Sequence, residues 1–335
     1  MPANLLEVRD LTVTFRTEAG PVTVVDHVSF SLAEREVLGI VGESGSGKTL
    51  SLLAVIGLIQ DPNAIVTGSV IYKGQQLIGV SPRRMHQIRG GDIAMIFQDP
   101  MTALTPVYTV GWQIAEQIRA HTDLSARATR RRVIELLDAV GLPDPARQAE
   151  RYPHQLSGGM RQRALIAMAL SCNPSVLIAD EPTTALDVTV QAQILRLLER
   201  LRHDFGSAIV LITHDIGVVA ELADRVIVMY AGRIVERGGR SDVLGNPMHP
   251  YTWGLLRSIP PLEGERPRRL AAIPGAPPAP AERPSGCPFR PRCAFRHARC
   301  LETPALFARN GQEVACFLIP EGTDPAHAPP SAEAA

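Results

Sequence analysis

The chain of 335 residues has no hydrophobic run long enough to cross a membrane. A spanning helix needs about 18 or more consecutive apolar residues, whereas the best runs here, such as residues 37–41 and 208–212, have the length of a strand. The N-terminus has no basic segment followed by an apolar one, so we expect no secretion signal. We therefore expect a chain that does not span a membrane by itself.

An excess of charge is also lacking, because 34 Lys and Arg residues balance 34 Asp and Glu residues. Without an overall positive field, we expect no nucleic-acid partner. Cysteine is scarce: the chain has five, and four of them come after position 286. In a chain with cytosolic features, this usage argues against a disulfide framework.

The hydrophobic pattern predicts an α/β fold. From residue 5 to about 240, short apolar runs alternate with segments of helical periodicity, which favours a mainly parallel sheet covered by helices on both faces. Alternating residues near 11–15 and 28–32 predict an antiparallel flap. Ser125 is expected to cap a helix that stops at Gly141. The other predicted strands are 36–41, 92–98, 176–179, 208–213 and 226–229, and the other helices are 48 to about 59, 189–204 and 215–223.

The composition changes after residue 259. Residues 260–285 contain eight prolines, which predicts a semi-extended linker that begins where the domain 1–259 ends. A short Cys-rich module is expected at 286–318, and the small, polar residues 319–335 are typical of a disordered tail.

A complete phosphate-binding loop, GESGSGKT, lies between a predicted buried strand and a predicted helix. Its glycines let backbone N–H groups turn toward a polyphosphate, the lysine reaches the terminal phosphates, and the threonine hydroxyl can ligate Mg²⁺. The sequence therefore predicts binding of a nucleoside triphosphate. The residues concerned are Gly42, Glu43, Ser44, Gly45, Ser46, Gly47, Lys48 and Thr49.

Two carboxylates, Asp180 and Glu181, end the apolar run that begins at Val176. A second strand beside the phosphate loop would bring Asp180 close to Mg²⁺, and Glu181 could orient the attacking water. Phosphoryl transfer depends on positioning and charge stabilisation, so one carboxylate for each task is enough.

The run LSGGMRQR at 156–163 resembles the signature motif of ATP-binding-cassette ATPases, and the other marks of that family occur in order. Phe15 resembles the aromatic residue that stacks on adenine, and Gln98 resembles the glutamine that contacts Mg²⁺ and the water. Residues 185–187 resemble the D-loop, and His214 resembles the switch histidine. The resemblance implies a P-loop cassette fold with an antiparallel β subdomain and a helical signature subdomain at about 99–172, and an ATPase that uses ATP and Mg²⁺.

In that family two cassettes pair head-to-tail, so the signature of one closes over the nucleotide of the other. The resemblance therefore implies that four residues act on the ATP of a partner. These are Ser157, Gly158, Gly159 and the D-loop Asp187.

Three segments narrow the resemblance: residues 97–106, 152–163 and 246–252 are similar to the cassette subunits of bacterial di- and oligopeptide importers of the DppD/OppD type, a group that includes nickel importers. This implies a second, homologous ATPase subunit, two transmembrane permease subunits and an extracytoplasmic peptide-binding protein as partners. It also implies a peripheral location at the cytoplasmic face of the inner membrane. Another solute, such as nickel or a glycopeptide, stays open, as do a non-transport cassette ATPase and a regulatory module that has lost hydrolysis.

The C-terminal cysteines are Cys287, Cys293, Cys300 and Cys316, spaced C-x5-C-x6-C-x15-C. This is neither the paired-knuckle pattern of a zinc ribbon nor the common ferredoxin spacing, so spacing alone leaves unligated thiols, zinc and an iron–sulfur cluster open. The run GCPFRPRC at 286–293 resembles the extension of the peptide-importer cassettes, which implies a [4Fe–4S] cluster, with zinc as the alternative.

Overall fold

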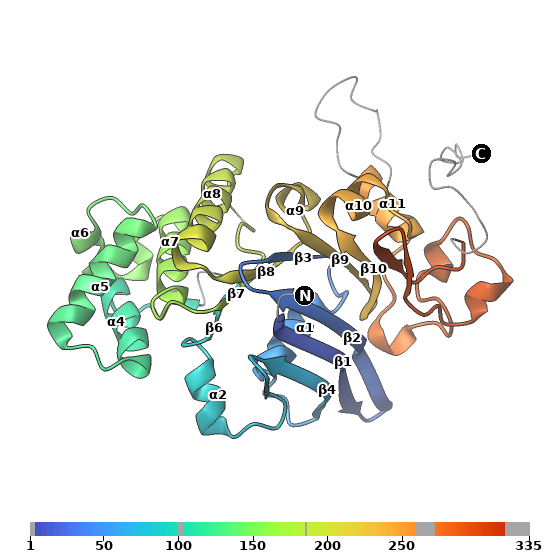
Figure 1. The fold of residues 1–335 in the computed structure, drawn as a ribbon, viewed down its shortest axis with the longest axis horizontal. Coiled ribbons are helices and arrows are strands. Elements are labelled where there is room, and N and C mark those ends of the chain that lie inside the picture. The colour runs from blue at the N-terminus through green and yellow to red at the C-terminus, as the bar shows by residue number, and fades with distance from the viewer. Residues whose placement is uncertain (1–3, 100–102, 185, 259–271, 319–335) are drawn as a thin grey trace.

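The structure is a computed structural model and describes residues 4–99, 103–184, 186–258 and 272–318. Two sheets and a set of helices make up the cassette, and the C-terminal region lies at one end of it (Figure 1). Among the described residues no helix is both long enough and apolar enough to cross a bilayer.

The first sheet is antiparallel and has the strand order β2-β1-β4-β5. Its strands are β1 (Asn4–Thr17), β2 (Gly20–Ala33), β4 (Ala64–Tyr72) and β5 (Gln75–Gln76). Apolar residues alternate along β1 and β2, so one face of the sheet is buried against the core, as the period-2 pattern predicts. The expected antiparallel flap is present.

The second sheet has eight strands in the order β11-β12-β10-β9-β3-β8-β7-β6. Strands β3 (Val37–Val41), β6 (Ile93–Ile96), β7 (Val176–Asp180), β8 (Ala208–Thr213) and β9 (Arg225–Tyr230) run parallel. Every residue of β3, β7 and β8 is buried, because helices or the first sheet cover both faces. The α/β cassette expected from the sequence is confirmed.

Helices cover this sheet. They are α1 (Lys48–Val55), α2 (Pro82–Ile88), α8 (Val188–Phe205), α9 (Ile216–Leu222), α10 (Arg240–Gly245) and α11 (Pro250–Arg257). The first ends at Val55, earlier than the expected end near residue 59. Gly57 takes a left-handed φ of 61°, and the Leu58 amide bonds to the Leu53 carbonyl 2.8 Å away, which closes the helix.

A helical subdomain lies at the β6 edge of the sheet (Figure 1). It holds α4 (Val110–His121), α5 (Ala126–Ala139), α6 (Pro145–Ala149), a 3-10 turn (Pro153–Gln155) and α7 (Gly158–Ala169). Ser125 caps α5 as predicted, since its hydroxyl accepts the Ala128 amide.

The C-terminal region joins the cassette more closely than the sequence suggests. Strand β12 (Gln312–Val314) pairs with β10 (Arg233–Gly239), and β11 (Phe307–Arg309) pairs with β12, so both extend the main sheet. Three short 3-10 helices complete the region: η2 (Pro280–Glu282), η3 (Arg290–Arg292) and η4 (Ala298–Leu301). The open edge of β10 supplies the backbone partners that a small module lacks on its own. The predicted linker residues 260–271 and the predicted tail 319–335 lie outside the described residues.

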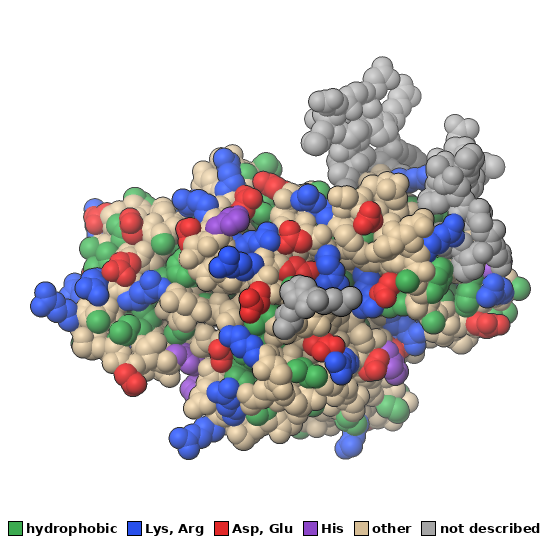
Figure 2. All heavy atoms as spheres, viewed as in Figure 1, with side chains coloured by type: hydrophobic (Ala, Val, Ile, Leu, Met, Phe, Trp, Pro, Cys, Tyr) green, Lys and Arg blue, Asp and Glu red, His purple; other side chains and the backbone are tan. Residues whose placement is uncertain are grey.

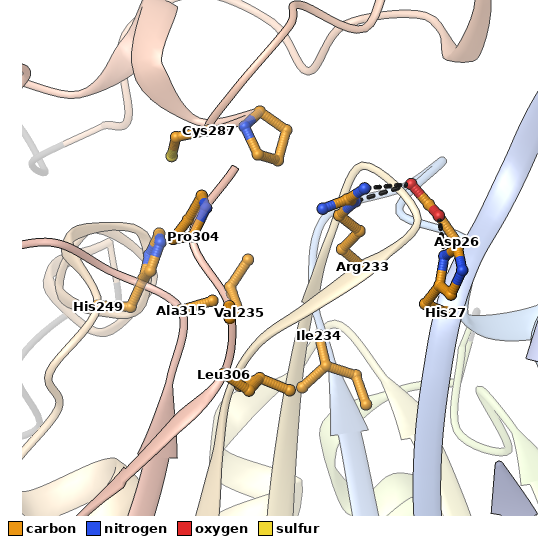
Figure 3. A pocket seen from close by; sticks show the side chains of 12 residues that line it. Asp26, His27, Arg233, Ile234, Val235, His249, Cys287, Pro304, Leu306 and Ala315 are labelled. Carbon is orange, nitrogen blue, oxygen red and sulfur yellow. Dashed lines mark hydrogen bonds and ion pairs between the residues drawn. The ribbon is translucent and has the colours of Figure 1, made fainter. Parts of the chain in front are cut away.

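Residues 272–318 and the cassette meet around a cavity of about 220 Å³ (Figure 3). Asp26 on β2 accepts ion pairs from Arg233 on β10 and from Arg283 of the expected linker, at 2.7 and 2.9 Å. Figure 3 shows Cys287 and Pro304 on the opposite wall. The described part of the expected linker is thus docked on the cassette.

Candidate nucleotide-binding and hydrolysis site

The phosphate loop connects the end of β3 to the start of α1, as the sequence predicts. Gly42, Gly45 and Gly47 all have positive φ, a conformation that strains any residue with a Cβ. A Cβ at Gly42 would also lie 2.2 Å from the Met229 carbonyl oxygen. These glycines are therefore required by the loop geometry that turns its amides toward a phosphate.

Lys48 is buried at the first position of α1, and its ammonium lies inside the loop. It donates to the carbonyls of Gly42 and Glu43, at 2.7 and 2.9 Å, and to the Ser46 hydroxyl at 3.3 Å. Burial lowers the pKa of Lys48, and the nearby carboxylates of Glu181, Asp180 and Glu43 act in the opposite direction. A polyphosphate at this point would supply the negative charge that favours the ammonium form.

Asp180 lies at the end of β7, next to the loop. The Thr49 hydroxyl donates to its carboxylate across 3.1 Å. Burial raises the pKa of Asp180, and the hydrogen bond from Thr49 partly offsets this. A divalent cation beside these two oxygens would stabilise the charged carboxylate, so the pair has the oxygen chemistry that Mg²⁺ prefers.

Glu181 gathers three polar side chains around its carboxylate. The Gln98 amide and the Thr184 hydroxyl each lie 2.9 Å from Oε2, and His214 Nδ1 lies 3.3 Å from Oε1. Glu181 has a φ of 47°, which is uncommon outside glycine and typical of residues held in place for a functional reason. The structure thus brings the three predicted hydrolysis residues, Glu181, Gln98 and His214, into one cluster.

Phe15 belongs to the antiparallel sheet. It is part of β1, opposite Val22 and Ala64, and packs partly buried against the apolar cluster that includes Leu52 of α1. Its expected contact with adenine stays a prediction.

The signature residues lie away from the phosphate loop of their own chain. Figure 1 shows α7 among the helices beside β6, with the strands β7 and β8 between it and α1. Ser157 caps α7, and its hydroxyl accepts the Met160 amide at 3.3 Å. Asp187 caps α8 in the same way, with Oδ1 3.0 Å from the Val190 amide. A Cβ at Gly159 would lie 2.9 Å from a methyl group of Val190, so only glycine fits there without a shift.

Sequence reasoning missed several residues that support the loop. Thr184, which bonds to Glu181, could have been noticed from its position next to the carboxylates. Gly232 donates its amide to the Ser46 carbonyl, and the Tyr251 hydroxyl accepts the Glu43 amide. Arg292 pairs with the Glu43 carboxylate. No local motif connects these last residues to the loop, because they reach it only through the tertiary fold.

The four C-terminal cysteines line one narrow cavity together with Phe289. Burial raises the pKa of Cys287, that of Cys293 to about 11 and that of Cys316 to about 12. Across 4–99, 103–184, 186–258 and 272–318, no set of three or more His, Cys, Asp or Glu side chains is arranged to hold a metal ion. The arrangement of these side chains therefore does not support the expected iron–sulfur or zinc site. Thiols are donors that both zinc and an iron–sulfur cluster accept, so the expected metal centre stays a prediction.

Three features define the class of protein: the phosphate loop around Lys48, the Asp180 carboxylate at the end of β7 and the cluster around Glu181. The class is a P-loop ATPase of the ATP-binding-cassette type. Residues 25–184 match the family described as ABC transporter, and residues 235–300 match the family described as oligopeptide/dipeptide transporter, C-terminal region. A dimeric ATP-binding cassette solved in a post-hydrolysis state with ADP and phosphate superposes with a TM-score of 0.63 at 28% identity, covering 70% of this chain and 98% of that one.

Full-length relatives narrow the class. The dipeptide transport ATP-binding protein DppD of Escherichia coli is 49% identical over 314 residues, which is 93% of this chain and 96% of the relative. A putative peptide import ATP-binding protein of Brucella abortus is 51% identical over 309 residues, or 92% of this chain and 93% of the relative. The chain belongs to the ATP-binding proteins of the oligopeptide and dipeptide ABC transporters. The resemblance drawn from the motifs is thereby confirmed.

Proposed function

We propose that this chain hydrolyses ATP to drive the import of di- and oligopeptides across the bacterial inner membrane. The observation that carries the proposal is the convergence of Gln98, Glu181 and His214 beside the Thr49–Asp180 pair. This constellation belongs to a chain that matches peptide-transport relatives over nearly their whole length.

In this proposal the loop amides and Lys48 would bind the phosphates, and Thr49, Asp180 and Gln98 would hold Mg²⁺. Glu181 would accept a hydrogen bond from the attacking water and direct its oxygen in line at the γ-phosphorus. The new P–O bond forms as the bond to ADP breaks, and the protons of the water leave with the released phosphate. His214, whose Nδ1 lies 3.3 Å from the Glu181 carboxylate, would keep that carboxylate oriented and would reach toward the γ-phosphate.

In the proposal two cassettes pair, and each completes the nucleotide site of the other. Ser157, Gly158, Gly159 and Asp187 would meet the ATP bound to a homologous ATPase subunit, which fits the exposure of Ser157, Gly158 and Asp187 in this chain. Because a closed pair contacts ATP differently from ADP, hydrolysis changes the stability of the closed state. That difference is the source of mechanical work in the proposal.

An exposed aromatic surface on the helical subdomain supports two permease subunits as partners. Tyr108 and Trp112 stack with ring centroids 4.0 Å apart, and both are exposed, as is Val107. The Val110 amide bonds to the Arg151 carbonyl at 2.9 Å, which brings the exposed Tyr152 to the same end of α4. Apolar side chains grouped in this way on a surface are typical of a protein interface.

This docking gives the chain a peripheral location at the cytoplasmic face of the membrane, where an extracytoplasmic binding protein delivers peptide through the permeases. A nucleic-acid partner is not part of the proposal. Figure 2 shows basic and acidic side chains interspersed over the visible face, which offers no continuous basic track for a phosphate backbone.

We further propose that the four C-terminal cysteines hold a [4Fe–4S] cluster in preference to zinc. When bound, the cluster would cross-link the short segments between Cys287 and Cys316, in addition to their pairing with the cassette. Anaerobically purified protein is expected to be brown and to lose that colour in each Cys→Ser variant. Colourless protein with stoichiometric zinc would favour zinc, and protein with neither metal would leave the thiols unligated.

The function is tested by uptake into membrane vesicles that carry this chain with the membrane subunits that co-purify with it. Labelled dipeptide should accumulate only with ATP, and the Lys48→Ala variant should abolish accumulation. Uptake of labelled nickel or of a glycopeptide in place of dipeptides would identify another solute. Failure of any membrane subunit to co-purify would favour a non-transport cassette.

A further inference from the structure

Glu43, the second residue of the phosphate loop, is held by segments far from it in the sequence. Its carboxylate accepts two hydrogen bonds from the Arg292 guanidinium, at 2.6 and 2.9 Å. Its amide donates to the Tyr251 hydroxyl across 2.8 Å, and its carbonyl accepts the Lys48 ammonium. Side chain, amide and carbonyl of this one loop residue are thus all engaged.

Arg292 is suited to hold a carboxylate in a fixed position. Its side chain is only 5% exposed, and its Nε and Nη2 also donate to the carbonyls of Pro274 and Gly275, at 2.9 and 3.2 Å. A planar guanidinium with two parallel bonds to a carboxylate fixes orientation as well as distance, which a lysine cannot do. Removing one member of such a buried pair leaves the other charge uncompensated.

The same part of the C-terminal region supports the second contact. Phe289 packs against the rings of Tyr230 and Tyr251, with centroids 5.2 and 5.4 Å away. Phe289 and Arg292 lie in the segment between Cys287 and Cys293. Arg292 contacts Glu43 directly, and Tyr251 contacts it while packing on Phe289, so both contacts depend on this segment. The cassette and residues 272–318 are therefore connected at the phosphate loop itself.

We propose that Arg292 is a positioning residue of the nucleotide site, through which the C-terminal region controls ATP affinity. It neutralises and restrains the Glu43 carboxylate, which otherwise adds an uncompensated negative charge beside the triphosphate and frees the loop backbone. The proposal rests on ATP binding by this loop, and it assigns to the Cys-rich segment a role beyond its own folding.

The test measures the affinity for a fluorescent ATP analogue, and KM and kcat for MgATP, with the full-length chain. Arg292→Gln is expected to weaken binding and raise KM about tenfold, with kcat at saturation changed by less than about twofold. Arg292→Lys, which keeps the charge but not the fork, should lie between this variant and the wild type. If repulsion by Glu43 is the cause, Glu43→Gln added to Arg292→Gln should restore most of the affinity.

Glu313→Gln is the matched control. It also breaks an ion pair between the C-terminal region and the cassette, that of Glu313 with Arg237, but at the β12–β10 edge. Its ATP affinity should equal that of the wild type.

An unchanged KM in Arg292→Gln, an effect no larger than that of Glu313→Gln, or a double variant as weak as Arg292→Gln would overturn the proposal. If Arg292→Gln does not fold, Arg292→Lys and Glu43→Gln decide it, because neither removes the side-chain volume. Lys48→Ala with wild-type ATP affinity would contradict the nucleotide site itself, and so separates the two failures.

Discussion

The phosphate loop occupies eight consecutive residues, whereas the two residues that hold Glu43 from outside, Tyr251 and Arg292, lie 208 and 249 positions further along the chain. Residues from both regions meet at Glu43. The loop carries the contacts that any triphosphate requires, and residues 272–318 add contacts that act on the loop. The residues expected to contact phosphate therefore lie in the N-terminal part of the chain, and the residues that hold Glu43 lie in the C-terminal part.

The largest effect is expected on the loop side of this comparison. Glu181→Gln should lower kcat by about a thousandfold while ATP binding is retained, because Asp180 and Lys48 still hold Mg²⁺ and phosphate but the water is no longer oriented. Steady-state phosphate release and retention of labelled ATP check this. Near-normal phosphate release would contradict the role of Glu181.

A smaller effect is expected from the signature, and on a different subunit. Gly159→Asp should reduce ATP hydrolysis at the site of the partner cassette about a hundredfold, because the new side chain both collides with Val190 and repels the γ-phosphate. Ser157→Ala should act in the same direction but more weakly, about tenfold. Photo-crosslinked ATP measured on each subunit checks this, and equal loss on both subunits would argue against the arrangement in trans.

The comparison is sharpened by the cysteines. Cys293→Ser should weaken ATP binding about threefold. Cys293 directly follows Arg292, so replacing its thiol should loosen η3. Cys172→Ser is the control, since Cys172 lies beyond α7 with its thiol near the Gln117 carbonyl. Equal ATP affinity in both variants would mean that the cysteine cavity and the phosphate loop act independently.

The last prediction concerns stability, not ATP, at the junction of the two regions. Glu236 is fully buried on β10, where it accepts the amides of Met248 and His249, and burial raises its pKa to about 7. Because this value lies above the ordinary 4.5, the stabilising contribution of Glu236 is present below pH 4.5 and is lost as the pH rises through 7.

The free energy of unfolding of the wild type, relative to Glu236→Gln, should therefore fall by about 3 kcal/mol between pH 4.5 and pH 8. Denaturant titrations across this range measure it. The low pKa of buried His249, about 3, affects both proteins equally and cancels in the difference. A difference that rises with pH would contradict the burial argument.

Most of the fold and of the hydrolysis cluster could be predicted from the sequence because each motif is local. A buried strand followed by a glycine turn and a helix specifies the phosphate loop. Carboxylates at the end of another parallel strand lie at the same edge of the sheet, and Asp180 reaches Thr49 although β8 separates β7 from β3. Gln98 and His214 lie just after β6 and β8, the two strands beside β7, so the strand order that the structure shows brings them to Glu181. The end of α1 was less predictable, since helix length depends on one glycine near its terminus.

The sequence by itself determined the class of protein, the phosphate loop and the carboxylates, because their chemistry depends on short runs whose geometry is set by backbone conformation. Only the tertiary structure decided that β11 and β12 extend the main sheet and that Arg292 reaches Glu43. An arginine carries no local signal of its partner: its long side chain pairs with whichever carboxylate the fold brings within reach. That partner is set by the packing of Phe289 and the open edge of β10, which no run of neighbouring residues records.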